Sequence, residues 1–423
     1  MKEKIFLVIG GGEYQLPLIE KVKKRGFKAW VADMNPDCPG KKAADFFIQK
    51  STRDEEGIVA ELHKNLKPHQ NLSGVATLGT DVPRTVARVA MEFSLPSVDY
   101  KTAVITTDKE KTRKTLNASR LPAIKYLSGG ENDIEHLLKE AFRFFEEDFL
   151  VKPVDNSGAR GVRLIKKDEG FEEAINKVKS ALNNSPQKRV ILEEYLDGVE
   201  FSMDAIVVDE EKIYVMDIAD RNIVLQGSSF IEVGHTVPTR RLNFSMQKRA
   251  EEILKKAIKT LGITKTGVNA DIKYSYRHGD FVVLEIASRL SGDKNASHTI
   301  PIAHGLDPVD YLIDIATGDD PSKKIEAALE PDGTRKLLRW AIHRALMLTH
   351  KIGKVVRKIL PDEEALNEIC EDWGLWLKEK DPITESQDNP SRHGYVIVSD
   401  HDYTKALHKA EKALKILGRA ILH

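Results

Sequence analysis

Short apolar runs alternate with amphipathic stretches at the start of the chain. The runs Ile5–Ile9 and Ala29–Ala32 are continuous and apolar, and a helical pattern lies between them at Tyr14–Arg25. A third strand is expected at Gly74–Thr77. Buried strands that alternate with helices are typical of a parallel sheet. The pattern therefore predicts an α/β domain over residues 1–107.

The pattern after residue 107 is less regular and predicts a mixed α+β region. We place this central region at 108–320, with a lid subdomain at about 121–192, and a small C-terminal α/β domain at 321–423. The polar segment Ser229–Pro238 is expected to be a loop. The expected strands are 122–127, 149–153, 162–165, 190–196, 201–207, 214–218, 222–225, 337–344 and 394–398, and the expected helices are 108–119, 133–147, 171–182, 246–261, 306–317 and 402–417.

Two strands joined by a short polar turn carry the clearest chemical signal. Alternation along them allows Asp271 and Glu285 to share one face of a paired hairpin. Two carboxylates in apolar surroundings are costly without a positive partner, and Mg²⁺ carried by nucleotide phosphates is such a partner. Arg289 follows four residues after Glu285 and is placed to bind a phosphoryl group or an oxyanion. The alternative is a hairpin whose charged residues face water.

Composition narrows the classes of function. The 423 residues suit two or three domains, and 65 basic residues balance 65 acidic ones. This balance gives no support for nucleic acid or a membrane as the main partner. Cys38 and Cys370 are the only cysteines, which excludes a disulfide scaffold and suits a reducing compartment. Because the first apolar run is too short for a signal peptide or a membrane span, we expect a cytoplasmic protein.

The glycines at 10–12 suggest a second interpretation, a dinucleotide site. They follow the first strand, and Asp33 lies at a suitable spacing for a ribose contact in a dinucleotide site. The fingerprint is incomplete because Gln15 occupies the place of its last glycine. We favour a tight strand-to-helix turn over a nicotinamide site.

Two lysines and a glycine-containing turn indicate a phosphate site. Lys109 lies in the first turn of an expected helix, where a phosphate would offset its unfavourable position against the helix dipole. Lys152 is fixed at a strand end, because Pro153 follows it. The turn 156–161 joins two strands, and its main-chain N–H groups suit phosphate oxygens. A surface lysine and an ordinary hairpin turn are the alternatives.

A strand that runs into a bend supplies further polar groups. Glu193 is a candidate acceptor for the exocyclic amine of adenine, and Glu200 for ribose hydroxyls. Glu232 and His235 stand three residues apart in the polar segment after it. No third metal ligand lies near them in the sequence, which argues against zinc.

Taken together and in this order, these motifs resemble the ATP-grasp superfamily. The resemblance rests on Asp-Lys at 108–109, Leu-Val-Lys-Pro at 150–153, Asn-Ser-Gly-Ala-Arg-Gly at 156–161, Leu-Glu-Glu-Tyr-Leu-Asp-Gly-Val-Glu at 192–200, and Asp271 with Glu285 and Arg289. It covers nearly the whole chain. It implies an ATP-grasp fold with an N-terminal Rossmann-like domain, a central nucleotide-binding domain with a mobile lid, and a small C-terminal domain.

The resemblance also implies roles for individual residues. ATP and Mg²⁺ (or Mn²⁺) are the implied cofactors, and Arg289 with Lys152 would be the catalytic residues. The residues implied for ATP are Lys109, Lys152, Ser157, Gly158, Gly161, Glu193, Glu194, Leu196 and Glu200, those for the metal are Asp271 and Glu285, and those for the substrate are Glu232 and His235.

Two positions depart from the pattern of the superfamily. Asp271 stands where Glu or Gln is common, and Ala287 stands where an Asn is usual in the second metal motif. Asn269 or Ser288 is expected to fill the place of that Asn, unless the metal has fewer protein ligands.

Within the superfamily, the motifs look most like the branch of L-amino-acid ligases and carbamoyl phosphate synthase. The implied function is an ADP-forming carboxylate–amine ligase that acts through an acyl phosphate on an amino acid or a similar small carboxylate. The partners would be small molecules, with a homodimer as a further expectation. The alternatives are a bicarbonate-activating carboxylase or purine-pathway enzyme, an NAD(P)-dependent enzyme, and a non-catalytic nucleotide sensor.

Overall fold

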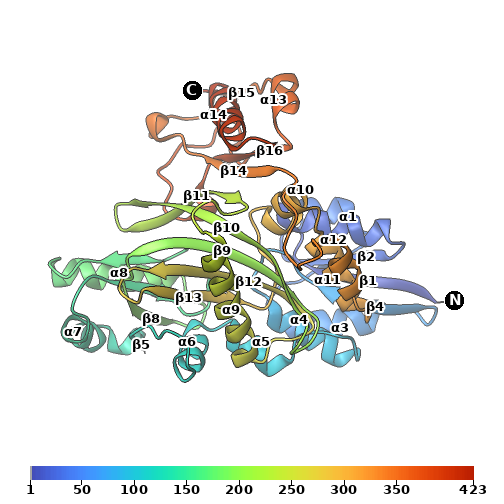
Figure 1. The fold of residues 1–423 in the computed structure, drawn as a ribbon, viewed down its shortest axis with the longest axis horizontal. Helices are drawn as coiled ribbons and strands as arrows, with labels where there is room; N and C mark the ends of the chain where they lie inside the picture. The colour runs from blue at the N-terminus through green and yellow to red at the C-terminus, as the bar shows by residue number, and fades with distance from the viewer. Residues whose placement is uncertain (1) are drawn as a thin grey trace.

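The structure is a computed structural model that describes residues 2–423 (Figure 1). Its N-terminal part is a parallel sheet in the order β3-β2-β1-β4. Residues of β1 point alternately into two cores: Phe6 and Val8 meet α1 and α11, whereas Ile5 and Leu7 meet α3 and α4. Covering on both faces explains why this strand is apolar throughout. The bounds are β1 Glu3–Ile9, β2 Lys28–Asp33, β3 Phe46–Gln49, β4 Gln70–Ala76, α1 Leu16–Lys24, α2 Pro39–Ala43, α3 Glu55–Asn65, α4 Pro83–Glu92 and α11 Pro308–Thr317.

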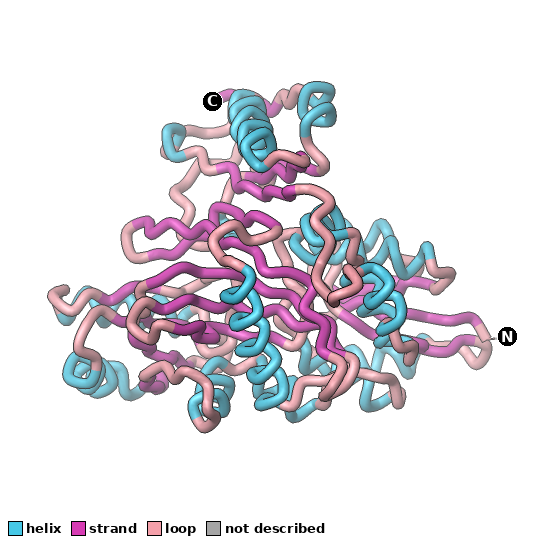
Figure 2. Tube along the Cα trace, viewed as in Figure 1, coloured by secondary structure: helices cyan, strands magenta, loops and turns pink. Residues whose placement is uncertain are grey.

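An antiparallel sheet of eight strands forms the centre of the molecule (Figure 2). Its order is β13-β12-β9-β10-β11-β14-β17-β16. One face packs on α9, whose apolar side chains share a core with β9, β12 and β13. The bounds are β9 Gly198–Val207, β10 Ile213–Gln226, β11 Ser229–Val237, β12 Thr266–Ser275, β13 Asp280–Ala287, β14 Trp340–Leu346, β16 Asp372–Leu375, β17 Gly394–Asp400, α5 Tyr100–Thr106, α6 Lys109–Asn117 and α9 Phe244–Leu261.

A small sheet in the order β5-β8-β6-β7 lies beside the central one and has its own core. The lid subdomain is defined here as this sheet with α7 and α8. Its α7 and α8 cover one face with Leu138, Ala141, Val178 and Ala181. The bounds are β5 Tyr126–Gly130, β6 Phe149–Pro153, β7 Arg163–Ile165, β8 Arg189–Glu194, α7 Ile134–Phe144 and α8 Phe171–Asn183.

The C-terminal part extends the central sheet. Strand β11 pairs with β14, and β14 pairs with β17, so three C-terminal strands continue the sheet that begins in the centre of the chain. Helix α14 packs on β14 and β17 through a stripe of alanines. The remaining elements are α10 Ile300–His304, α12 Ser322–Ala328, α13 Glu363–Ile369, α14 Tyr403–Arg419, β15 Lys358–Ile359 and β18 Ile421–Leu422, with short helices at 13–15, 131–133, 295–299, 349–351 and 389–391.

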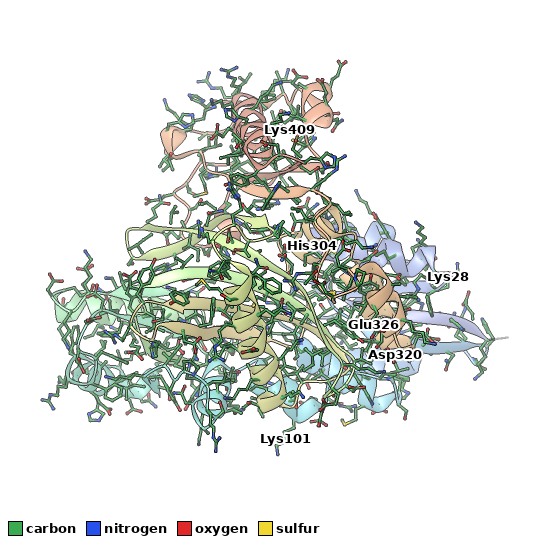
Figure 3. The ribbon with its side chains drawn as sticks, in the orientation of Figure 1. Lys28, Lys101, His304, Asp320, Glu326 and Lys409 are labelled. Atoms are coloured by element: carbon green, nitrogen blue, oxygen red, sulfur yellow. The ribbon has the colours of Figure 1, made fainter. Side chains whose placement is uncertain are left out.

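Polar contacts hold the helices α10–α12, which connect the central sheet to the N-terminal sheet. Glu326 of α12 accepts a hydrogen bond of 2.6 Å from Tyr214 on β10, and Asp320 pairs with Lys212 at 2.7 Å. His304 lies inside the molecule, where its Nε2 is 3.0 Å from Oδ1 of Asp217 (Figure 3). These contacts attach α10 and α12 to strand β10 of the central sheet, while α11 packs on the N-terminal sheet.

The fold confirms the mixed α/β class predicted from the sequence and corrects three local predictions. The segment expected as a loop at 229–238 is strand β11, since it is paired on both sides. The strands expected at 214–218 and 222–225 form one strand, β10. The strand expected to begin at Pro122 begins at Tyr126. Strand β5 pairs with β8 and strand β11 pairs on one side with β14, and both partners are distant in the sequence. Strand β10 instead pairs with its neighbours in the chain, β9 and β11.

A glycine in β11 allows the close approach of β14. Gly234 has φ +142°, and a Cβ atom there would overlap the main-chain oxygen of His343. We expect Gly234→Ala to lower the free energy of unfolding by about 2 kcal/mol or more, because strain and overlap add. Chemical denaturation measures the change. Gly170→Ala is the control, since Gly170 has φ −63° and open space, and an equal loss in both variants would contradict the prediction.

Candidate active site

A cavity of about 690 Å³ lies where the lid subdomain, the central sheet and both terminal parts meet. Its walls come from regions that are far apart in the sequence. They include the turn 12–15, the lid residues 150–162, the strands β9, β10, β11, β12 and β13, and the C-terminal residues Trp376, Asn389, Pro390 and Arg392. Every candidate site residue from the sequence except Gly161 lines this cavity.

The hairpin β12–β13 brings two carboxylates onto one face. Asp271 is directly opposite Glu285 in the register, and a register break follows Asp271. Burial, together with repulsion by Glu285, Glu232 and Glu200, raises the pKa of Asp271 to about 7, although the nearby Arg221 lowers it. Such a carboxylate gains from a neighbouring positive charge.

Both candidate lysines point into this region. Lys109 Nζ lies 3.1 Å from Oε1 of Glu285 and donates a 2.6 Å hydrogen bond to the oxygen of Asn156. Lys152 Nζ donates to Oε2 of Glu193 at 2.7 Å. Helix α6 and the end of β6 are joined at this point by a 2.8 Å bond from the Lys109 N–H to the oxygen of Val154.

Glu193 is fully engaged by side chains of the protein. Arg113 Nε donates to its Oε1 and Lys152 to its Oε2, both at 2.7 Å. Although burial raises its pKa, these two cations lower it to about 2. These contacts favour a role for Glu193 in holding Lys152 in place, rather than the adenine contact expected from the sequence. Arg113 was missed, although it lies one helical turn after Lys109.

The strand end after Glu193 forms one wall of the cavity. Residues 194–196 border the cavity, and Lys273 Nζ donates to the oxygen of Leu196 at 2.8 Å. Glu200 faces the same space and accepts from Lys273 at 2.9 Å. The carboxylate of Glu194 points elsewhere, to the Lys125 N–H at 2.7 Å and to Arg277 at 2.9 Å.

The turn 156–161 covers the cavity. Gly158 and Gly161 have φ of +66° and +73°, in the left-handed region that favours glycine. The oxygen of Gly158 accepts a 3.0 Å bond from the Asn389 N–H of the C-terminal part. Arg160 folds back onto the oxygen of Ser157 at 2.9 Å. The turn is therefore held against the C-terminal part above the cavity.

Arg289 connects the hairpin to the N-terminal part. Its Nε donates to Oδ1 of Asp81 at 2.8 Å, and its Nη1 donates to Oδ1 of Asn269 at 3.0 Å. Asn269 is opposite Ala287 in the register and lines the cavity. Ser288 instead bonds Thr106 in the interior. Of the two residues expected to fill the place of the absent Asn, Asn269 has the suitable position.

Glu232 and His235 lie on β11 at the other end of the cavity. Glu232 Oε2 accepts from Arg221 Nη2 at 2.8 Å. His235 stacks on His343 with ring centroids 4.7 Å apart and an angle of 4°. The Nδ1 of His235 is 3.8 Å from Oε1 of Glu232.

Two residues at this end, Asp293 and His343, were missed by sequence reasoning because they are distant from His235 in the chain. Asp293, His343 and His235 have ligand atoms within 4.8 Å of one another, so the third ligand absent from the local sequence exists in space. Arg392 donates two bonds to Asp293, at 2.7 and 2.8 Å. This guanidinium already supplies the positive charge that Asp293 needs.

The glycine turn after β1 is filled by the protein itself. The Gly11 N–H donates to Oδ2 of Asp33 at 2.8 Å, and the Gly40 N–H donates to the oxygen of Gly11 at 2.7 Å. A Cβ atom on Gly11 would overlap Sγ of Cys38. The carboxylate and the space that a dinucleotide would need are both occupied, which argues against the nicotinamide hypothesis.

Comparison with known proteins agrees with this geometry. Residues 145–297, which hold Lys152, the turn 156–161, Glu200, Asp271, Glu285 and Arg289, match the family described as ATP-grasp domain. This chain carries an ATP-grasp domain. The domain as matched extends from the lid subdomain through the hairpin, and the rest of the chain completes the cavity around it.

Similar proteins with an assigned activity include ligases, synthases and carboxylases. The phosphoribosylamine–glycine ligase of Methanococcus maripaludis is 25% identical over 335 residues, which cover 74% of this chain and 72% of that protein. The carbamoyl phosphate synthase large chain of Caldanaerobacter subterraneus is 25% identical over 95% of this chain, which spans only 36% of that protein. The L-amino acid ligase of Bacillus licheniformis shares the fold, with a TM-score of 0.79, 18% identity and 98% of each chain covered.

No helix within residues 2–423 has both the length and the apolar character needed to cross a membrane.

The buried imidazole of His343 gives a pH-dependent prediction. Its ring nitrogens have no hydrogen-bond partner among residues 2–423, and burial lowers its pKa to about 3. The unfolded chain therefore binds a proton below about pH 6.5 that the folded chain does not, so stability falls as the pH decreases from 6.5. We expect His343→Phe to reduce the loss of unfolding free energy between pH 7 and pH 5 by about 1–2 kcal/mol. Denaturation at the two pH values measures it.

The control for this experiment is His401→Phe, because His401 is exposed. The control should keep the pH dependence of the wild-type protein. An unchanged pH dependence in His343→Phe would show that the buried ring is not responsible.

Proposed function

We propose that the chain is an ATP- and Mg²⁺-dependent, ADP-forming ligase that joins a small carboxylate to an amine through an acyl phosphate. The observation that carries the proposal is the convergence of Asp271, Glu285, Lys109 and Arg289 on one cavity beneath the turn 156–161. The matched ATP-grasp domain and the ligases among the similar proteins support it.

The lid end of the cavity is the proposed nucleotide half. The main chain at 194–196 would meet the adenine and Glu200 the ribose. Lys109 and Lys152 would bind phosphate oxygens, with Glu193 and Arg113 fixing Lys152 in place. The N–H groups around Ser157, Gly158 and Gly161 would cover the phosphates.

Asp271 and Glu285 suit Mg²⁺ (or Mn²⁺). They are paired in the register, line the cavity, and repel each other, and burial disfavours the charged form of Asp271. Carboxylates together with phosphate oxygens are ligands that Mg²⁺ prefers. The ion, when bound, neutralises the charge of the phosphates. The shorter side chain of Asp271 and the amide of Asn269 are the adaptations that this chain would use in place of the usual residues.

The residues of the chain provide the remaining chemistry. An oxygen of the substrate carboxylate attacks the γ-phosphorus of ATP, and the bond from that phosphorus to ADP breaks. Arg289, oriented by Asp81, stabilises the charge on the transferred group and on the tetrahedral species that the amine forms. The amine then displaces phosphate and loses a proton. The turn 156–161 keeps water from the acyl phosphate.

The opposite end of the cavity is the proposed substrate half. Glu232 and His235 line it, together with Arg392, Trp376 and Tyr14. Charged and aromatic side chains around a confined space suit an amino acid or a similar small carboxylate. We also propose the division of the chain into 1–107, 108–320 with a lid at about 121–192, and 321–423.

Single substitutions at the hairpin test the proposal. We expect Glu285→Ala or Arg289→Ala to reduce ADP formation by a factor of about 10³ or more, because each removes charge stabilisation of the transferred group. Phosphate release with ATP, Mg²⁺ and pairs of amino acids measures it, after circular dichroism shows an intact fold. Glu252→Ala and Arg249→Ala are matched controls, because both side chains lie in exposed ion pairs on α9.

Normal turnover in both hairpin variants would rule out the assigned centre. Bicarbonate is tested in a separate assay. ADP release that needs bicarbonate but no amino acid would assign the cavity to bicarbonate activation instead. ATP binding without ADP release in every arm would identify a nucleotide sensor.

A further inference from the structure

Arg221 of β10 stands between the two halves of the cavity. Its Nη1 lies 2.6 Å from Oδ2 of Asp271, at the proposed metal position. Its Nη2 and Nε donate to Oε2 of Glu232 at 2.8 and 3.3 Å, at the proposed substrate end. The side chain is only 12% exposed. One guanidinium therefore bridges a nucleotide-side and a substrate-side carboxylate.

The other cations of this cluster are paired elsewhere, and Arg221 is shared between carboxylates. Lys109 lies on Glu285 at 3.1 Å, and Lys273 lies on Glu200 at 2.9 Å. Arg221 faces Asp271 and Glu232 and is also 3.4 Å from Glu200. Arg289 is paired with Asp81. Among the described residues of this cluster, Arg221 is thus the cation in contact with Asp271.

A metal ion at Asp271 has to compete with this contact. A divalent cation on that carboxylate would stand next to a guanidinium at hydrogen-bond distance, and the repulsion is strong where water is scarce. The contacts of Arg221 with Glu232 involve two other nitrogens, so they do not have to break. The least costly response is release of the single contact with Asp271 while the pair with Glu232 is kept.

We propose that Arg221 is a positioning residue that holds Asp271 until a metal-bound nucleotide takes this carboxylate, and that it then turns fully to Glu232. This inference rests on the proposed function, because it takes Asp271 as a metal ligand. Its consequence is that filling the nucleotide half fixes Glu232, and through it His235 at 3.8 Å, in the substrate half. By thermodynamic linkage, the state of Glu232 also changes the affinity of the metal.

Mn²⁺ binding to the ADP-loaded protein tests the proposal, with free Mn²⁺ measured by electron paramagnetic resonance. We expect Arg221→Gln to lower the dissociation constant of Mn²⁺ by about tenfold or more, because it removes the competing cation and leaves the carboxylates. A purely structural role would weaken binding instead. The matched control Arg249→Gln, in an exposed ion pair with Asp280, should not change it. Unchanged or weaker Mn²⁺ binding in a folded Arg221→Gln variant overturns the inference.

A double-mutant cycle tests the link to the substrate half. Glu232→Gln leaves Arg221 with Asp271 as its stronger partner, so we expect it to weaken Mn²⁺ binding severalfold in the wild-type background. In the Arg221→Gln background the same change should have a much smaller effect. Equal effects in both backgrounds would show that Arg221 does not transmit the change.

Two further outcomes of the Mn²⁺ experiments have their own interpretation. If Arg221→Gln does not fold, Arg221→Lys replaces it, and its point charge, which cannot bridge two carboxylates as a planar guanidinium does, should tighten Mn²⁺ binding by about threefold. Unchanged affinity in Arg221→Lys then overturns the inference. Absence of ADP and Mn²⁺ binding in the wild-type protein would refute the proposed function itself.

Discussion

The cavity depends on keeping several buried carboxylates close together. Glu200, Glu232, Asp271 and Glu285 converge on it, and each contacts a cation of the protein at between 2.6 and 3.1 Å. Burying a charge without a partner is costly, so the cations are part of the condition for folding. The same arrangement favours an exchange of charged partners, because a ligand that carries its own charges can replace a contact within the protein at little cost in free energy.

The fold supplies this concentration of charge by joining distant segments. The central sheet takes strands from residues 198 to 400, and the lid subdomain brings Lys152 and Glu193 over its face. Asp81 reaches the hairpin from the N-terminal part, and Arg392 reaches Asp293 from the C-terminal part. The cavity is therefore an interface of all parts of the chain, and a change in the position of one part alters the partners available to the others.

The hairpin shows how a residue on one strand can stand beside a position that lacks the side chain expected there. Ala287 removes an amide from one strand, yet Asn269 stands opposite it on the neighbouring strand and already bonds Arg289 at 3.0 Å. An antiparallel pair allows this exchange because opposite residues share a face. Glu193 shows the converse. Its position matches the motif, but Arg113 and Lys152 occupy both of its oxygens.

The sequence by itself determined the alternation along the first hairpin strand, the buried N-terminal strand, the two lysines at element ends and the order of the motifs. These features depend on local period and on neighbours in the chain, which a sequence records directly. On the second hairpin strand a register break, which alternation does not predict, turns Glu285 away from the core that holds Phe281 and Val283. Only the tertiary structure decided that 229–237 is a strand, that His343 and Asp293 lie beside His235, and that Arg221 bridges Asp271 and Glu232. The physical reason is that strand pairing and charge pairing join residues across long stretches of chain, and nothing in the local pattern specifies the partner.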